Sequence, residues 1–284
     1  MGLARPTIAV VGHVEHVTLG KVATLPATGD IVHLDDPVVI PGGGGGVTFF
    51  QLVRAPAVVH LFTALGNDTA GAEMEERVRA TAAEVHIARR AEPHTRDVVL
   101  LTPDGERTIL VVGQPLHPRH DDPLPWDALT RCDAAYFTAY DPELIRYTRR
   151  AGYLMVSARR RDSLIRSEAR ADIVVGSHRD PREASTLADY PVAPAALVMT
   201  DGPRHGTIET ASGTQRFAAP PSPSAIASSY GAGDSFAGAL LWFALQGLPL
   251  VTACERAGHY GAAVLGGRDP IESQRALAAR ETGE

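Results

Sequence analysis

A glycine-bracketed aspartate near the carboxyl end of the chain has the residue types that phosphoryl transfer requires. Residues 228–241 read SSYGAGDSFAGALL, so Gly231, Ala232 and Gly233 come directly before Asp234 and an apolar run. We expect a helix to begin near Gly233 or Asp234, with first-turn amides that lack internal partners and carry partial positive charge. An anion can approach such amides closely, while Asp234 can accept the proton of an attacking hydroxyl. The same residues also fit a structural alternative, a tight turn whose first-turn acid favours the helix dipole.

A second glycine cluster, Gly42 to Gly46, precedes another expected helix. It is not a Walker A loop, because Val47 and Thr48 follow it in place of the lysine and hydroxyl residue of that motif. Gly12, at the end of the first expected strand, does not begin a dinucleotide fingerprint, since that motif needs further glycines. The cluster therefore suggests either a ligand close to the backbone or a flexible, close-packed hinge.

The elements that must position these glycines alternate between strands and helices. Residues 7–12 are β-branched and apolar, as in a buried parallel strand, and residues 13–41 alternate in polarity as short antiparallel strands do. Residues 95–113 read as a hairpin that turns at Pro103, Asp104 and Gly105. We expect helices at 69–84 and 181–190, among others, and from residue 134 onward strands and helices alternate. This alternation predicts a mainly parallel central sheet with helices on both faces.

Composition excludes several other classes of protein. The 284 residues carry a formal net charge of −6 with scattered Lys and Arg, so we expect no nucleic-acid partner. Two cysteines support neither a disulfide framework nor a structural zinc site. The first apolar run is too short for a signal peptide or a membrane span, so we expect a cytoplasmic protein with no membrane partner.

The combination of motifs resembles the PfkB carbohydrate kinases, also called the ribokinase-like family. The resemblance covers essentially the whole chain and implies one ribokinase-like α/β domain over residues 1–284, with a mainly parallel central sheet flanked by helices. It also implies a small β-sheet lid formed by about residues 13–41 and 89–113. The segments that carry it are, in order, PGGGGGVTFFQLVRAPAVVHLFTALGNDTAG (41–71), PDGERTI (103–109), VMTDGPRHG (198–206) and GAGDSFAGALL (231–241).

The resemblance implies an ATP-dependent kinase that uses Mg²⁺, with Asp234 as the catalytic base. Gly231, Ala232 and Gly233 would form the anion hole for the transferring phosphoryl group. The sugar pocket would be lined by Gly42, Gly43, Gly44, Gly45 and Val47.

The nucleotide would lie at the other end of the site. Thr200 and Gly202 would contact the ATP phosphates or ribose, and the stretch 258–265, which includes His259, would flank the adenine. Ser177 and Asp180 stand where the family has an Asn-x-x-Glu motif that organises magnesium and phosphate, so Asp180 is the expected metal-binding residue.

Three further positions depart from the family pattern, two at the expected acceptor pocket and one at a cation site. Val17 replaces an aspartate and Val47 an asparagine, two groups that bind sugar hydroxyls in many members, so free ribose is not the expected acceptor. His13 and Glu15 either replace those contacts or only decorate a strand end. Ser228 replaces an acidic residue that helps to bind a monovalent cation, so we do not count such a cation among the expected cofactors.

The expected function is therefore ATP-dependent phosphorylation of a hydroxyl on a small sugar or sugar-like acceptor. Two alternatives stay open at the level of the sequence: a nucleoside kinase of the same family, and a weakly active or inactive member that binds a ligand. A homodimer through the lid is a possible assembly. We read Arg159, Arg160 and Arg161 as a solvated loop or helix start, and His117 as ordinary loop polarity.

Overall fold

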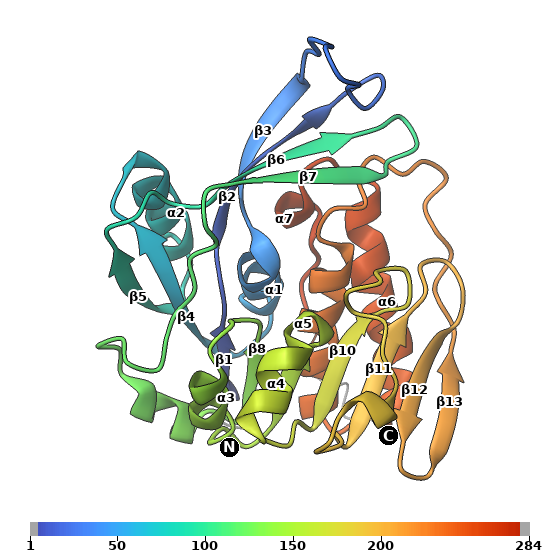
Figure 1. Ribbon diagram of the computed structural model, residues 1–284. Helices are drawn as coiled ribbons and strands as arrows, with labels where there is room; N and C mark the ends of the chain where they lie inside the picture. Colours follow the sequence, from blue (N-terminus) through green and yellow to red (C-terminus); the bar gives the residue numbers. More distant parts are fainter. Residues whose placement is uncertain (1–4, 279–284) are drawn as a thin grey trace.

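The computed structural model describes residues 5–278, which form two β-sheets and the helices packed on them (Figure 1). The central sheet has nine strands in the order β13-β12-β11-β10-β9-β8-β1-β4-β5. Its strands run parallel from β5 to β11, and the last two are antiparallel. The strands are β1 (Thr7–Val11), β4 (Val58–Gly66), β5 (Glu84–Arg90), β8 (Ala134–Phe137), β9 (Leu154–Ser157), β10 (Ile173–Ser177), β11 (Ala196–Thr200), β12 (Gly206–Thr210) and β13 (Gly213–Phe217).

Helices cover both faces of this sheet. Alternate residues of β1 divide between two apolar clusters: Ile8 and Val10 pack under one set of helices, and Ala9 and Val11 under the other. The first set is α1 (Gly43–Leu52), α2 (Thr69–Arg79), α5 (Ala232–Leu245) and α6 (Leu250–Leu265), and the second is η1 (Trp126–Arg131), α3 (Pro142–Thr148) and α4 (Arg161–Ser167). No helix among residues 5–278 is long and apolar enough to cross a membrane.

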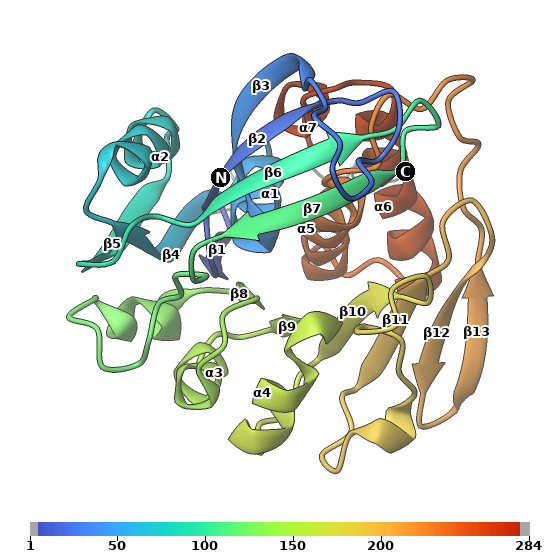
Figure 2. The same ribbon diagram turned by 45° about the horizontal axis from the view of Figure 1, so that its top comes forward.

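A small four-stranded sheet stands at the carboxyl-terminal edge of the central one (Figure 2). Its order is β3-β2-β6-β7, with two antiparallel hairpins joined by the parallel pair β2–β6. The loop joining β6 to β7 contacts the segment before α5, because the Ser229 amide donates to the Gly105 carbonyl over 2.9 Å. The strands are β2 (Glu15–Lys21), β3 (Asp35–Gly42), β6 (Arg96–Leu101) and β7 (Arg107–Val112).

The structure confirms three sequence predictions: the mainly parallel sheet flanked by helices, the 95–113 hairpin and the two helices that follow glycines. The helix expected at 69–84 is wrong at its end, since α2 stops at Arg79 and Glu84 begins β5, which pairs with β4. Polar and apolar residues alternate from Glu84 to Ile87, as suits a strand, and pairing with β4 outweighs the local helix preference.

The structure also differs from the sequence predictions near β12 and β13 and at the start of the second lid segment. Residues 181–190, expected as a helix, form turns and a short 3₁₀ segment, η3 (Leu187–Asp189), in which Thr186 and Asp189 cap each other. The β12–β13 hairpin was not expected at all. Residues 89–90 lie in β5 of the central sheet, so the second segment of the small sheet begins at Arg96.

Candidate active site

Two helix N-termini meet where the expected catalytic turn lies. Gly231, with φ 79°, precedes α5, and Gly43, with φ 77°, opens α1; both are in the left-handed region that favours glycine. The Thr48 hydroxyl of α1 donates to the Asp234 carbonyl over 3.1 Å and ties the helices together. A methyl group placed on Gly44 would lie 3.3 Å from Asp234 Oδ1. The Asp234 carboxylate therefore faces the first turn of α1.

The glycines serve packing at some positions and leave space at others. A side chain at Gly45 would come within 2.5 Å of the His13 carbonyl, so this glycine lets α1 pack against the end of β1. At Gly233 nothing lies within 4 Å, so the first turn of α5 opens onto free space beside Asp234. The glycines therefore have two functions: Gly45 allows close packing of α1, and Gly233 leaves space for a ligand at the N-terminus of α5.

Desolvation raises the pKa of Asp234, and the guanidinium groups of Arg107 and Arg159 oppose the shift. The two cations come from different directions, since Arg107 begins β7 of the small sheet and Arg159 follows β9 of the central sheet. A carboxylate in partly desolvated surroundings with cations nearby is suited to accept a proton near neutral pH.

A pair of buried acids lies on the small sheet beside this carboxylate. Glu15 on β2 is 8% exposed and Asp97 on β6 is 3% exposed, and the two side chains share a hydrogen bond. Desolvation first, and then the charge of Asp97, raise the pKa of Glu15 well above its usual range. Desolvation also raises the pKa of Asp97. Burial of two neighbouring acids therefore favours a proton shared between them, and the pair presents polar atoms from the sheet.

Two imidazoles form another wall of the same pocket. His13 Nε2 accepts a hydrogen bond from the Gly44 amide over 3.1 Å, and its ring lies 4.7 Å from that of His117. Desolvation, followed by the charge of Arg160, lowers the pKa of His13 to about 3. Desolvation also lowers the pKa of His117. Both rings are neutral near pH 7 and act as hydrogen-bonding groups rather than as cations.

The two valines at departing positions lie in an apolar cluster. Val17 and Val47 are fully buried and pack with Tyr230, whose hydroxyl accepts from the Gly43 amide over 3.0 Å. Asp97 stands directly opposite Val17 on the neighbouring parallel strand, so both point from the same face of the small sheet. The carboxylate that position 17 of β2 lacks is thus present at the paired position of β6.

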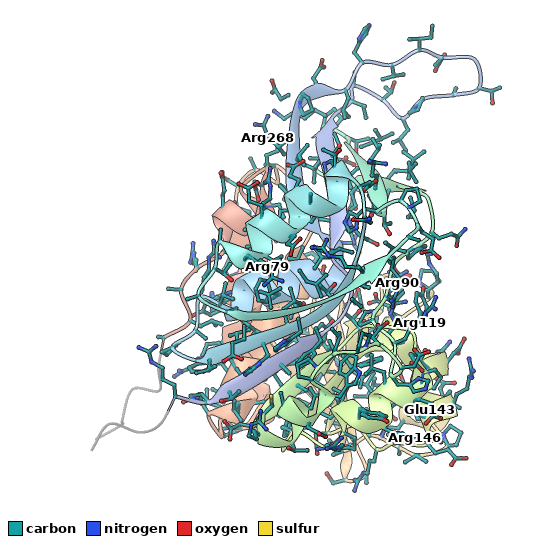
Figure 3. The ribbon with its side chains drawn as sticks, turned by 90° about the vertical axis from the view of Figure 1, so that its left-hand side faces the viewer. Arg79, Arg90, Arg119, Glu143, Arg146 and Arg268 are labelled. Atoms are coloured by element: carbon teal, nitrogen blue, oxygen red, sulfur yellow. The ribbon has the colours of Figure 1, made fainter. Side chains whose placement is uncertain are left out.

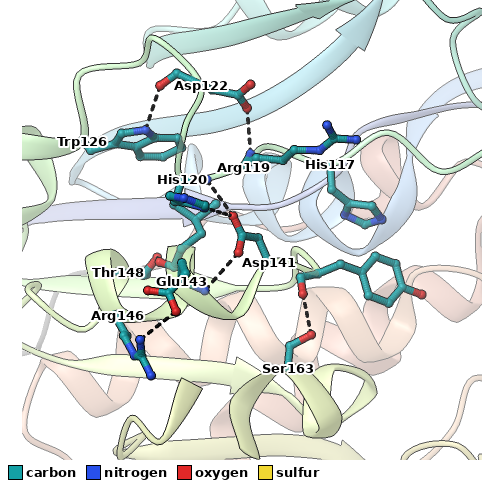
Figure 4. Close-up of polar contacts among 12 residues, drawn as sticks. His117, Arg119, His120, Asp122, Trp126, Asp141, Glu143, Arg146, Thr148 and Ser163 are labelled. Atoms are coloured by element: carbon teal, nitrogen blue, oxygen red, sulfur yellow. Dashed lines mark hydrogen bonds and ion pairs between the residues drawn. The ribbon is translucent and has the colours of Figure 1, made fainter. Parts of the chain in front are cut away.

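The loop that carries His117 is held from both sides (Figures 3 and 4). Asp122 accepts from the Arg119 amide over 2.7 Å and from Arg90 Nη1 at the end of β5 over 2.6 Å. His120 donates from its amide to Asp141, and the His120 ring contacts the same carboxylate at 2.7 Å. A cleft of about 450 Å³ runs along this loop, and His117 and Tyr140 are among the residues that line it.

Most residues expected to hold a nucleotide gather at the ends of β10 and β11. Thr200 and Ser177 are register partners at these ends, and the Ser177 hydroxyl accepts from the Arg179 amide over 3.2 Å. Gly202 has φ 58°, and a side chain there would meet Arg179 Nη1 at 2.8 Å. His259 is exposed on α6. Ser177, Thr200 and Gly202 thus lie at one edge of the central sheet, where the carboxyl ends of its parallel strands meet, and no hydrogen bond or ion pair within residues 5–278 joins His259 to this edge.

Two carboxylates suited to a divalent cation follow β10. Asp180 and Glu183 both pair with Arg159, the latter over 3.1 Å. Desolvation raises the pKa of Glu183, and the charges of Asp180 and Asp234 add to the shift. Mg²⁺ prefers carboxylate and phosphate oxygens, so the carboxylates of Asp180 and Glu183 are suitable ligands for it. In this structure Arg159 pairs with both carboxylates.

Comparison with known proteins identifies the family. The family model described as the pfkB family carbohydrate kinase matches residues 5–277. The chain belongs to the PfkB family of carbohydrate kinases. The PfkB chain is thus a phosphotransferase by family, and its fold is that of the solved kinases that it resembles. No curated protein matches the sequence.

Solved structures share the fold at low sequence identity. A ribokinase from Thermotoga maritima has a TM-score of 0.75 at 14% identity, covering 96% of this chain and 97% of that one. A nucleoside kinase from Methanocaldococcus jannaschii has a TM-score of 0.73 at 13% identity, covering 96% of both chains. An Arabidopsis thaliana ribokinase complexed with ribose and ATP has a TM-score of 0.72 at 16% identity, also covering 96% of both.

In this PfkB kinase the tertiary structure brings together most residues that the sequence singled out. Asp234, His13 and Glu15 all lie around Gly43 and Gly44 in the first turn of α1. Sequence reasoning missed Asp97, Glu183 and Arg107, and took His117 and the arginines after β9 as ordinary surface residues. The arginines directly follow the buried strand β9, and ligands of α/β proteins bind at the carboxyl ends of such strands. This position is the sequence signal that could have indicated a role for them in the site.

Proposed function

We propose that the protein is an ATP-dependent kinase that phosphorylates a hydroxyl of a small sugar or sugar-like acceptor, with Asp234 as the general base. The observation that carries this proposal is the position of the Asp234 carboxylate. It lies between the open first turn of α5 and a pocket of buried polar groups. An alcohol in that pocket and a phosphoryl group on the helix N-terminus would both reach the same carboxylate.

Each part of the site has a task in this reaction. The acceptor hydroxyl gives its proton to Asp234 as its oxygen attacks phosphorus, and the raised pKa makes the carboxylate a better base. The amides of Gly231, Ala232 and Gly233 hold the charge that develops on the phosphoryl oxygens. Arg107 adds positive charge from the small sheet.

The nucleotide would be held along the β10 and β11 ends. Thr200, Gly202 and Ser177 would contact its phosphates or ribose, and His259 on α6 lies in the segment expected to flank the adenine. Mg²⁺, held by Asp180 and Glu183, would neutralise phosphate charge. The Arabidopsis ribokinase complex with ribose and ATP, a structure of the same fold, supports this assignment of the cofactor.

We further propose that residues 1–284 act as one kinase domain in which the small sheet is a lid. The lid supplies Glu15, Asp97 and Arg107 to the site, so its closure would complete the pocket and exclude water. A salt bridge of 3.3 Å joins Glu106, in the lid turn, to Arg179 beside the proposed nucleotide site. Nucleotide binding and lid position would thus be coupled.

The test is release of ADP with ATP and Mg²⁺ across a panel of sugars, sugar acids, sugar phosphates and nucleosides. Asp234→Asn should lower acceptor-dependent release at least about a hundredfold, the usual effect of losing a general base. Asp162→Asn, which changes an exposed first-turn acid of α4, is the matched control and should retain activity. Equal release by wild type and Asp234→Asn would refute the role of this carboxylate.

The same panel separates the remaining alternatives. Turnover confined to nucleosides would identify a nucleoside kinase, the activity named for the Methanocaldococcus protein. Ligand binding without turnover on any acceptor would identify a binding protein. The intact geometry around Asp234 favours the enzyme.

A further inference from the structure

One cation beside the acceptor pocket has no anionic partner. Arg160 is only 5% exposed, yet no carboxylate of residues 5–278 forms an ion pair with it. Its Nε donates to the Thr138 carbonyl over 2.8 Å, and its guanidinium carbon lies 3.8 Å from the centroid of the Tyr140 ring. Its Nη1 is buried without a hydrogen-bond partner. The preceding residue, Arg159, is by contrast fully engaged with Asp180 and Glu183.

A buried guanidinium without a partner is unfavourable to a folded protein. An arginine stays charged under essentially all conditions, and an unpaired buried charge loses its hydration without compensation. The nearby Glu15 forms no ion pair with Arg160, and burial raises the pKa of its carboxyl, which favours the uncharged form. A bound anion would restore the balance of charge.

Arg160 lies on the acceptor side of the site rather than the phosphate side. Its charge acts on His13, His117 and Glu15, whereas the cations that act on Asp234 are Arg107 and Arg159. The other groups facing it are the Tyr140 ring and Tyr136. The guanidinium therefore faces the neutral imidazoles and the acid pair, where the body of the acceptor would lie.

We propose that the acceptor carries a carboxylate, which binds the buried guanidinium of Arg160 at Nη1, the nitrogen without a hydrogen-bond partner, so that the substrate class is a sugar acid or a similar polyhydroxy carboxylate. This inference rests on the proposed kinase function. The planar fork of arginine matches a carboxylate in two parallel hydrogen bonds. The neutral His13 and His117 and the Glu15–Asp97 pair remain to bind hydroxyl groups.

A carboxylate fits this place better than a phosphate ester. One guanidinium balances one negative charge, whereas a phosphate monoester carries between about −1.5 and −2 at neutral pH. Tyr140, whose ring contacts the guanidinium, also lines the cleft that runs past His117.

The experiment compares acids with their neutral counterparts. The probes are D-gluconate with D-glucose, D-ribonate with D-ribose, and D-ribose 5-phosphate as the phosphate arm. We expect a kcat/KM for a carboxylate probe about a hundredfold above that for its neutral partner, and Arg160→Met should abolish this preference. Arg160→Lys, which keeps the charge without the fork, should retain part of it. Arg161→Met is the matched control, because Arg161 bonds only the Ala184 carbonyl.

Binding of the same probes to Asp234→Asn, measured by calorimetry, separates this inference from the kinase proposal. Carboxylate binding that is lost in Asp234→Asn/Arg160→Met supports the Arg160 site even without turnover. Asp234-dependent turnover with equal preference for acids and neutral sugars would overturn it and leave the kinase standing. A preference for the phosphate probe would also overturn it. Circular dichroism of each variant verifies folding, and the result for Arg160→Lys decides the case if Arg160→Met does not fold.

Discussion

At the scale of single residues, the acceptor pocket depends on groups whose protonation is set by burial. Glu15 and Asp97 lie on adjacent strands with little solvent around them, and the charge of Asp234 also raises the pKa of Glu15. One proton shared between two carboxyls avoids two buried like charges. A pair that shares one proton can both donate to and accept from a polyhydroxy ligand, whereas the side chains of Val17 and Val47 can do neither.

Glu15→Gln should make the protein more stable than wild type as the pH rises. Below pH 4.5 the Glu15 carboxyl is protonated in both the folded and unfolded chains, and its stabilising proton is fully retained. Above that pH the unfolded chain releases the proton first, so wild-type stability falls by about 1.4 kcal/mol per unit of raised pKa. Glutamine keeps a donor toward Asp97 without this dependence.

Urea unfolding at several pH values between 5 and 8 measures the difference. The difference in free energy of unfolding between Glu15→Gln and wild type should increase in favour of the variant as the pH rises across this range. Glu76→Gln, which changes an exposed glutamate of α2, should show the same pH dependence of stability as wild type. Parallel pH curves for wild type and Glu15→Gln would show that the pair does not hold the proton.

At the scale of elements, the β6–β7 hairpin connects the proposed lid to the segment before α5, the helix that carries Asp234. Arg107, the first residue of β7, donates to the Ser229 hydroxyl over 3.1 Å just before the α5 turn. The root of the hairpin is anchored by Asp68, which caps α2 through the Gly71 amide and also binds Arg96 of β6 over 3.0 Å. One hairpin thus sets both the pocket wall and the charge above Asp234.

Arg107→Met should shift the acidic limb of the kcat/KM profile to higher pH. The base must be deprotonated to act, and Arg107 lowers its pKa, so loss of this cation raises the pKa at which activity appears. A pH–rate profile of the best acceptor checks the shift. Arg216→Met, at an exposed cation on β13, serves as the control. A lower rate with an unmoved limb would mean that Arg107 acts only in binding.

At the scale of the whole molecule, the edge of the small sheet is unusually apolar. Ile109, Leu110, Val111 and Val112 of β7 are between 42% and 52% exposed, and β7 has a free edge because it pairs only with β6. Exposed apolar edge strands attract a further strand. We propose that a second copy of the chain covers this strand, in the dimer through the lid that the family resemblance suggests.

Val111→Lys should convert a dimer into a monomer. A lysine on the strand would carry a charge into the apolar contact and protect the edge. Light scattering after size-exclusion chromatography measures the mass, which is 30.1 kDa for one chain. Ile31→Lys, at the 93% exposed tip of the β2–β3 loop, should leave the dimer intact. A wild-type monomer at every concentration, or a dimeric Val111→Lys, would contradict the proposal.

Local sequence predicted the elements that depend on local rules. The helix after Gly231, the 95–113 hairpin and the buried strands follow from turn residues, periodicity and the special freedom of glycine, which act over a few residues. The errors at residues 80–90 and 181–190 come from segments whose local preference is outweighed by pairing with a distant strand or by turn-capping polar contacts.

The sequence by itself thus determined the fold class, the family and the glycine turn before Asp234. Only the tertiary structure decided which groups face that turn. Asp97 joins Glu15 because β6 pairs with β2, and Arg160 reaches His13 because β8 and β9 follow β1 in the sheet. Burial and charge are properties of that arrangement, so no local pattern distinguishes the unpaired Arg160 from the paired Arg159 beside it.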